Sequence, residues 1–180
     1  MNAPAVTAPA DGALPAGAPS PELLAEIAAF LHLEARLADA SRYAEWEALV
    51  TDDMHYWVPK GPADHEPGSR LSYINDNRAR LATRIRQLQS GLRHAQTPPS
   101  PLTRLVSNIE LLGVESNGDY RVGAAFVVYE LAVQSTGALR LWPGRVTYRL
   151  RRVDGALRMA QKVVELVTAT APQPNMTFLL

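Results

Sequence analysis

Cysteine is absent from this 180-residue sequence. Its absence excludes a disulfide scaffold, a thiolate nucleophile, a cysteine-based zinc site and any iron–sulfur cluster held by this chain. The chain also carries no net charge, because 18 basic side chains balance 18 acidic ones. Neutrality of this kind argues against a protein whose partner is nucleic acid.

Long hydrophobic runs are missing as well. No apolar stretch approaches the ~20 residues that span a bilayer, so we expect no membrane contact. The first residues lack the basic patch and apolar segment of a signal peptide, which favours a soluble, cytoplasmic protein. The length and the hydrophobic content of 47% suit a single domain with its own core.

The chain divides into a tail and one domain. Residues 1–20 are mostly Ala, Pro and Gly with Asp11 as their one charge, which predicts a disordered tail. Residues 21–180 then form the predicted single domain. A helix start is indicated by Ser20-Pro21-Glu22, since serine caps, proline suits the first helical position and glutamate meets the positive helix end.

Apolar residues at helical spacing predict three helices in the first half of this domain. They are expected at about 21–39, 42–50 and from 75 or 76 to about 92. A short strand is expected at 54–58, followed by a polar loop at 60–70 that is rich in Pro and Gly. Consecutive prolines at 98 and 99 cannot continue the third helix.

Alternating patterns dominate the second half. Strands are expected at 102–114, 120–134, 139–152 and 157–167, separated by turn signals such as Asn117-Gly118 and Asp154-Gly155. Hairpins of this kind predict a mostly antiparallel sheet with one solvated face. Helices followed by a long meander indicate an α+β fold. A long curved sheet around the N-terminal helices gives the conical, cystatin-like fold shared by ketosteroid isomerase and nuclear transport factor.

Charge is unevenly distributed along the chain. Residues 21–76 hold 11 acidic and 4 basic side chains, whereas residues 77–180 hold 6 acidic and 14 basic ones. Two interpretations are open: the halves pair with each other inside one chain, or the arginines form a surface for an acidic partner. Arginine suits both, because its guanidinium forms bidentate ion pairs and is enriched at interfaces.

Chemistry-bearing residues are sparse. The four histidines include no pair at i, i+3 or i, i+4, and the nearest grouping for a mononuclear iron is His55 with Asp52 or Asp53. Those aspartates follow a predicted helix, where Asp commonly makes turn hydrogen bonds. We therefore predict no metal site in this chain. Phosphate-binding glycine loops and Gly-x-Ser-x-Gly elbows are also lacking.

An acid–base pocket inside the cone is the alternative. Its candidate residues are Tyr43, Asp52, Asp53, His55 and Tyr56, and it would make the protein a stand-alone isomerase, dehydratase or cyclase. The apolar segment Met176–Leu180 is a further open question. It predicts burial, either on its own domain or on a partner.

Several segments in order resemble one known family. The sequence resembles the small (beta) subunit of Rieske-type aromatic ring-hydroxylating dioxygenases across residues 22–180. The matching segments are Glu34-Ala35-Arg36-Leu37, Trp46-Glu47-Ala48-Leu49, Asp52-Asp53-Met54-His55-Tyr56-Trp57-Val58-Pro59, Arg78-Ala79-Arg80-Leu81, Pro99-Ser100-Pro101, Ser107-Asn108-Ile109 and Lys162-Val163-Val164.

The resemblance implies a partner and cofactors outside this chain. Family members assemble with a larger alpha subunit, commonly as a trimer of alpha–beta pairs. That alpha subunit carries the Rieske [2Fe–2S] cluster and a mononuclear non-haem iron. A reductase, in some systems with a ferredoxin, supplies electrons from NAD(P)H, and the complex adds dioxygen to an aromatic ring in catabolism. The beta subunit is mainly structural.

The residues agree with a structural role. A Rieske centre needs two Cys and two His, so a chain without cysteine cannot hold it. We therefore expect no catalytic, cofactor-binding or metal-ligating residues here, and we expect subunit contacts instead. The predicted contact residues are Tyr56, Trp57, Arg78, Arg84, Arg104, Trp142 and Phe178.

Overall fold

The computed structural model describes residues 19–90, 98–133, 135–176 and 178–180. Residues 1–18 of the predicted tail lie outside this description. The elements follow in the order α1 (Pro21–Asp39), α2 (Tyr43–Glu47), β1 (Val50–Pro59), β2 (Ser72–Asn77), α3 (Arg78–Gln89), β3 (Leu102–Val114), β4 (Tyr120–Leu131), β5 (Leu139–Val153) and β6 (Ala156–Leu166).

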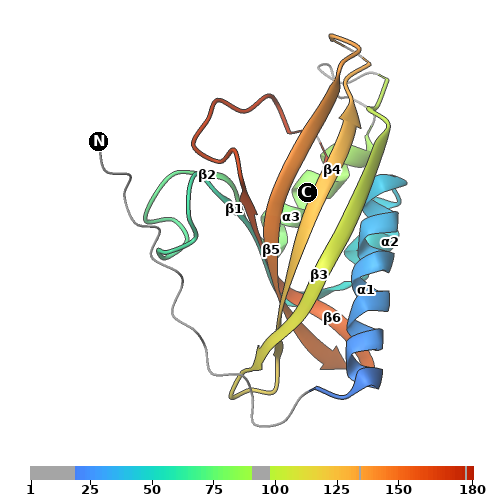
Figure 1. The fold of residues 1–180 in the computed structure, drawn as a ribbon, viewed down its shortest axis with the longest axis vertical. Coiled ribbons are helices and arrows are strands. Elements are labelled where there is room, and N and C mark those ends of the chain that lie inside the picture. Colours follow the sequence, from blue (N-terminus) through green and yellow to red (C-terminus); the bar gives the residue numbers. More distant parts are fainter. Residues whose placement is uncertain (1–18, 91–97, 134, 177) are drawn as a thin grey trace.

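One twisted, six-stranded sheet organises the domain. Its strand order is β2-β1-β6-β5-β4-β3, and all neighbours are antiparallel except the parallel pair β1–β6. Figure 1 shows α1 running along the edge strand β3, with α3 behind the long strands β3–β5. The predicted α+β fold with a curved, mostly antiparallel sheet is confirmed.

Helix α1 forms as its sequence predicts. The Ser20 side chain accepts a hydrogen bond from the Leu23 amide at 3.2 Å, and Pro21 occupies the first turn. Ile27, Phe30 and Leu31 recur on one face and are buried against the sheet. This spacing places the inner face of α1 inside the cone.

The region between α1 and α3 differs from the prediction. Strand β1 begins at Val50 rather than at 54. Ser72–Asn77 forms the unpredicted strand β2, so the third helix begins at Arg78 rather than at 75 or 76. Pairing with β1 explains this, because Trp57 lies opposite Asn75 and the Lys60 amide donates to the Leu71 carbonyl. Helix α2 ends at Glu47 for a similar reason: Val50 already pairs with β6.

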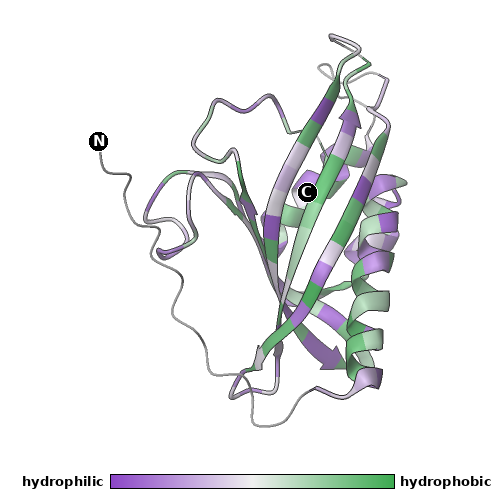
Figure 2. Cartoon of the chain, viewed as in Figure 1, coloured by the Kyte–Doolittle hydropathy of each residue, from purple (hydrophilic) through white to green (hydrophobic). Residues whose placement is uncertain are grey.

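The core lies between the inner face of the sheet and the helices. Figure 2 shows alternating hydrophobic and hydrophilic residues along β3 and β5, the pattern of strands with one buried face. Trp46, Trp142, Tyr56 and Tyr148 are among the largest fully buried side chains. Among the helices of the described residues, none is both long and apolar enough to cross a membrane.

Candidate functional site

A buried polar cluster occupies the interior of the cone. Glu34 projects from α1 and Lys162 from β6, and Glu34 Oε1 lies 2.7 Å from Lys162 Nζ. Trp46 Nε1 donates to Glu34 Oε1 at 2.6 Å, and the Tyr148 hydroxyl donates to Glu34 Oε2 at 3.4 Å. These four residues, named here the Glu34 cluster, join α1, α2, β5 and β6.

The charges of the Glu34 cluster stabilise each other. Burial alone would raise the pKa of Glu34, but the nearby cations Lys162 and Arg104 and the hydrogen bonds it accepts hold that pKa below its ordinary value. Burial lowers the pKa of Lys162, and attraction to Glu34 opposes that effect. The ammonium also lies 5.6 Å from the Tyr148 ring centroid, a cation–π distance.

The C-terminal residues close the cone beside this cluster. Phe178, Leu179 and Leu180 are all buried. Arg104 Nη2 donates to the Leu179 carbonyl at 2.9 Å, and the Leu180 amide donates to the Tyr56 hydroxyl at 2.9 Å. In Figure 1 the C-terminus lies against the middle of the sheet. Of the two alternatives for this segment, the structure shows burial on its own domain.

Aromatic packing completes the closure. The Phe178 ring meets the Trp142 ring edge-on, with centroids 5.5 Å apart. Trp142 Nε1 donates to Glu130 Oε2 at 3.0 Å. Buried side chains of the described residues therefore occupy the interior of the cone, where a small substrate would have to lie.

Two hollows among the described residues lie on the outside of the molecule. One, of about 480 Å³, lies between α1 and β3 and is lined by residues that include His32, Arg36 and Asp39. Another, of about 330 Å³, lies on α3 beside Arg80 and Arg84. Neither is lined by a member of the Glu34 cluster.

The five acid–base candidates do not meet. Asp53 binds Arg151 at 3.0 Å on the surface, whereas His55 Nε2 lies 2.8 Å from Asn75 Oδ1. The Tyr43 hydroxyl accepts a hydrogen bond from Ser41, and Asp52 is exposed. Burial raises the pKa of Tyr56, so its hydroxyl stays protonated at neutral pH. These residues lie in separate places and form no acid–base pocket.

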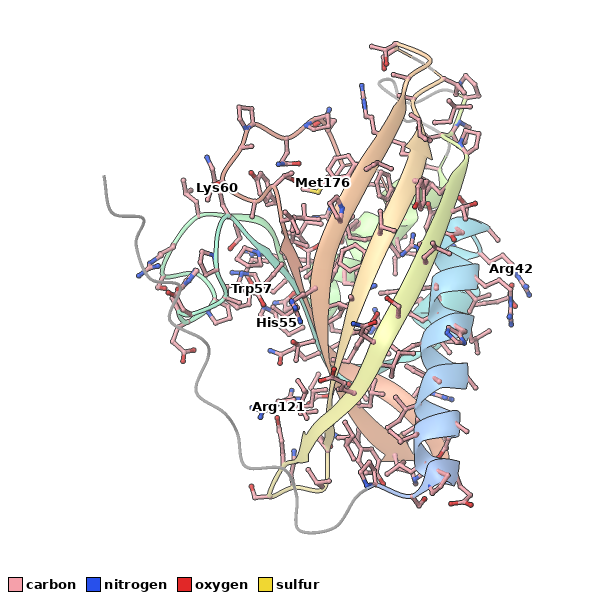
Figure 3. All side chains as sticks on the ribbon, in the orientation of Figure 1. Arg42, His55, Trp57, Lys60, Arg121 and Met176 are labelled. Carbon is pink, nitrogen blue, oxygen red and sulfur yellow. The ribbon has the colours of Figure 1, made fainter. Side chains whose placement is uncertain are left out.

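The described residues also lack a cluster of side chains that could bind a metal ion. Within the described ranges, no group of three or more His, Asp and Glu side chains is placed to hold a metal ion. His94 lies outside those ranges. In Figure 3, His55 and Trp57 lie on the β1 side of the sheet, away from α1.

The predicted aromatic contacts are made inside this chain. Tyr56, Trp57, Trp142 and Phe178 are each less than 5% exposed. Trp57 Nε1 donates to Ser72 Oγ at 2.8 Å, and its ring meets the His65 ring edge-on. Within this chain, core packing and local hydrogen bonds cover these four side chains, and their contact with a partner stays a prediction.

The predicted arginines also have partners within the chain. The Arg104 side chain is only 3% exposed, and its Nε lies 2.6 Å from Asp39 Oδ1. Arg104 therefore belongs to the interior as well, where it links α1, β3 and the C-terminal segment. Arg78 and Arg84 lie on α3 with about 30% of each side chain exposed, so they reach the surface.

Ion pairs between the two halves account for much of the uneven charge. Each joins a carboxylate from residues 21–76 to a cation from residues 77–180, which supports the intramolecular interpretation. The pairs are Glu26–Arg152, Glu34–Lys162, Asp39–Arg104, Glu47–Arg78, Asp53–Arg151 and Asp76–Arg84.

The sequence analysis missed the Glu34 cluster as a unit, although it contains a signal. Glu34 lies three residues after Leu31 and seven after Ile27, so a carboxylate occupies the apolar stripe of α1. Lys162 is one of only two lysines and lies on the inward-facing side of β6. Buried charges of opposite sign in two elements predict an ion pair across the core.

Known proteins match both the sequence and the fold. A family model described as "Ring hydroxylating beta subunit" matches residues 33–173. The small oxygenase component of the p-cumate 2,3-dioxygenase system of Pseudomonas putida is 36% identical over 139 residues, covering 76% of this chain and 75% of that protein. The benzene 1,2-dioxygenase subunit beta of Pseudomonas putida is 28% identical, covering 88% of this chain and 89% of that protein.

A solved structure is similar in fold. The beta subunit of the benzoate 1,2-dioxygenase from Burkholderia mallei has a TM-score of 0.68 and is 21% identical. The match covers 83% of this chain and 94% of that one.

Proposed function

This chain belongs to the ring-hydroxylating beta-subunit family, and from that premise we propose that it is the structural, non-catalytic subunit of a multicomponent oxygenase that hydroxylates an aromatic compound. The observation that carries the proposal is the filled cone. The Glu34 cluster occupies its interior, and Phe178–Leu180 close it. This arrangement disfavours the alternative of a stand-alone isomerase, dehydratase or cyclase, which needs an open pocket.

The partner that we propose is a Rieske alpha subunit, assembled with this chain as a trimer of alpha–beta pairs. The alpha subunit would hold both the [2Fe–2S] cluster and the mononuclear iron. The lack of cysteine in this chain supports that assignment, because a Rieske cluster needs two cysteine ligands. A reductase, in some systems with a ferredoxin, would deliver electrons from NAD(P)H through alpha, and such an electron supply favours a cytoplasmic location.

The contribution of this chain is a rigid body with a defined surface. Its ion pairs tie α1 and α3 to the sheet, and a hydrogen bond from Arg104 on β3 holds the C-terminal segment. Of the predicted contact residues, Arg78 and Arg84 stay in the proposal, because part of each guanidinium remains at the surface of α3. Arginine is favoured at interfaces with carboxylate-bearing partners.

Coexpression with the Rieske alpha subunit of the same oxygenase tests the proposal. Light scattering should give one stable particle whose mass corresponds to three alpha–beta pairs, and this particle should oxidise an aromatic compound with NAD(P)H and the reductase. The chain alone should show no turnover. A chain that ignores alpha and converts a substrate by itself would contradict the proposal.

A further inference from the structure

Helix α3 carries charge of one sign. Its 12 residues include four arginines and no acidic residue. Solvated helices commonly mix the two signs, because oppositely charged side chains one turn apart stabilise the helix. Leu81 and Ile85 on its inner face are fully buried, so core packing fixes the position of the helix. Helix α3 therefore presents its arginines from a rigid part of the domain (Figure 1).

Two of the four arginines have acidic partners inside the chain. Arg78 Nη1 lies 2.7 Å from Glu47 Oε1, and Arg84 Nε lies 2.6 Å from Asp76 Oδ2. Both pairs tie α3 to the elements that precede it in the chain, so the fold accounts for these two cations. The same pairs neutralise the two carboxylates.

The other two arginines, Arg80 and Arg86, lack an acidic partner. Both are exposed, and within the described ranges no carboxylate lies within ion-pair distance of either. Arg80 Nη1 donates to the Asn75 carbonyl at 3.3 Å, and Arg86 Nη2 donates to Thr83 Oγ1 at 2.8 Å. These neutral partners orient the two guanidinium groups and leave their charges uncompensated.

Helix stability does not explain Arg80. It lies in the first turn of α3, where the positive end of the helix dipole disfavours a cation. It also precedes Arg84 by four residues, a spacing at which like charges repel. Helix α1 has the favourable arrangement, with Glu22 in its first turn and Arg36 in its last. A cation at a position where it weakens the helix indicates a role in binding.

A hollow of about 330 Å³ opens on this surface of α3. Positions 80, 83, 84 and 87 of its lining share one face of the helix, because they are spaced three and four residues apart. The acid of the hollow is neutralised by its pair with Arg84. The α3 hollow, as it is called below, is lined by Asp76, Ala79, Arg80, Thr83, Arg84 and Gln87.

A carboxylate fits the chemistry of the α3 hollow. The Arg80 guanidinium can bind a carboxylate through paired, charge-assisted hydrogen bonds, and the Thr83 hydroxyl and Gln87 amide supply further donors. Nucleic acid is disfavoured as the source of negative charge, because the chain as a whole carries no net charge. The complementary surface is therefore an acidic segment of a protein.

We propose that the alpha subunit docks an acidic segment on α3, with a carboxylate held in the α3 hollow by Arg80 and with Arg86 at its border. This inference rests on the proposed function and names the surface through which it operates. Charge complementarity supports the occupant, because α3 keeps two cations that its own chain leaves unpaired. The predicted contact residues Arg78 and Arg84 lie on the same helix.

Binding of the alpha subunit to a charge-reversed variant tests the inference. Arg80→Glu should weaken binding of alpha at least about tenfold, the factor that corresponds to 1.4 kcal/mol. Added salt should weaken wild-type binding more than binding by this variant, because the variant has lost the screened attraction. Arg36→Glu is the matched control, since Arg36 is an exposed arginine on α1 outside the α3 hollow, and it should change binding less than twofold. Circular dichroism melting should show that both variants fold.

The outcomes separate this inference from the proposed function. Wild-type protein that fails to bind alpha would contradict the proposed function, and the docking surface with it. Wild-type binding that the folded Arg80→Glu variant matches would overturn only the docking surface, and so would equal losses in Arg80→Glu and Arg36→Glu. A chain that self-associates alone, and becomes monomeric in Arg80→Glu without losing alpha binding, would assign the α3 hollow to a second copy and overturn the inference as well.

Discussion

The Glu34 carboxylate and the Lys162 ammonium, 128 residues apart in the chain, meet at 2.7 Å in the interior of the cone. Each side chain is at most 2% exposed. Trp46 and Tyr148 donate hydrogen bonds to the same carboxylate, so its oxygen atoms have partners. The interior is thus a satisfied polar network that connects the first helix to the last strand.

Breaking this ion pair from one side should be costly. Lys162→Met leaves the Glu34 carboxylate buried without its cation, and we expect a loss of about 3–5 kcal/mol in the free energy of unfolding. Urea unfolding followed by circular dichroism measures this loss. The double variant Glu34→Gln with Lys162→Met removes both charges and should lose clearly less than the two single variants summed. Additive losses would show that the two charges do not interact.

Phe178 should matter for folding although it lies near the chain end. Phe178→Ala removes the ring that packs on Trp142, and a cavity at a buried Phe costs about 3–5 kcal/mol. Thermal melting of the isolated chain measures the effect. Asn175→Ala in the exposed part of the same segment is the control and should melt like the wild type. Equal melting temperatures for both variants would contradict closure of the cone by this segment.

Gly144 on β5 is required by close packing. A Cβ atom there would lie 2.6 Å from the Glu165 carbonyl oxygen and 2.8 Å from Phe126 Cε1. Gly144→Ala should therefore destabilise the fold by about 1–3 kcal/mol through strain. Gly113→Ala is the matched control, because its Cβ would meet nothing within 4 Å. Denaturant midpoints that are equal for the two variants would refute the close approach of β5 and β6.

Acid should weaken the fold partly through Asp119. The bidentate hydrogen bonds from Arg151 hold the pKa of Asp119 below its ordinary value, against the effect of burial. A depressed pKa contributes stability above the unfolded-state value of about 3.9, and that stability is lost as the pH falls through the folded-state pKa. The free energy of unfolding from urea titrations at pH 7, 5, 4 and 3 should show this decline.

Removing the carboxylate gives the control for this pH effect. Asp119→Asn should be less stable than the wild type at pH 7, and the difference should shrink toward pH 3. Asp154→Asn, at an exposed turn position, should follow the wild-type curve at every pH. A constant difference between Asp119→Asn and the wild type would show that Asp119 does not titrate with folding.

Much of the architecture could be predicted because burial of one sheet face imposes alternation. The segments at 102–114 and 157–167 alternate clearly and form β3 and β6. Strand β2 escaped prediction because Asn75, Asp76 and Asn77 have low strand propensity. There, pairing with β1 and the ion pair from Asp76 to Arg84 override the local preference.

The sequence could not show which side chains pair with each other at the candidate site, because the pairing residues lie far apart in the chain. An arginine such as Arg104 suits an interface and a buried ion pair equally well, and only the fold brings Asp39 to its side. The same holds for Trp142, whose indole would suit either environment but binds Glu130 inside the core. By contrast, Glu34 on the apolar stripe of α1 and Lys162 on the inward face of β6 both carry a sequence signal, which the sequence analysis did not use.

Turnover by the reconstituted oxygenase tests the central claim most directly. The alpha subunit would be assembled with wild-type chain or with the variants His55→Ala and Asp52→Asn, which alter the strongest acid–base candidates of this chain. Steady-state kcat per alpha subunit for aromatic oxidation should agree within twofold for all three assemblies, because this chain supplies structure and no reacting group. A loss of kcat of a hundredfold or more, in an assembly of unchanged mass, would contradict the account.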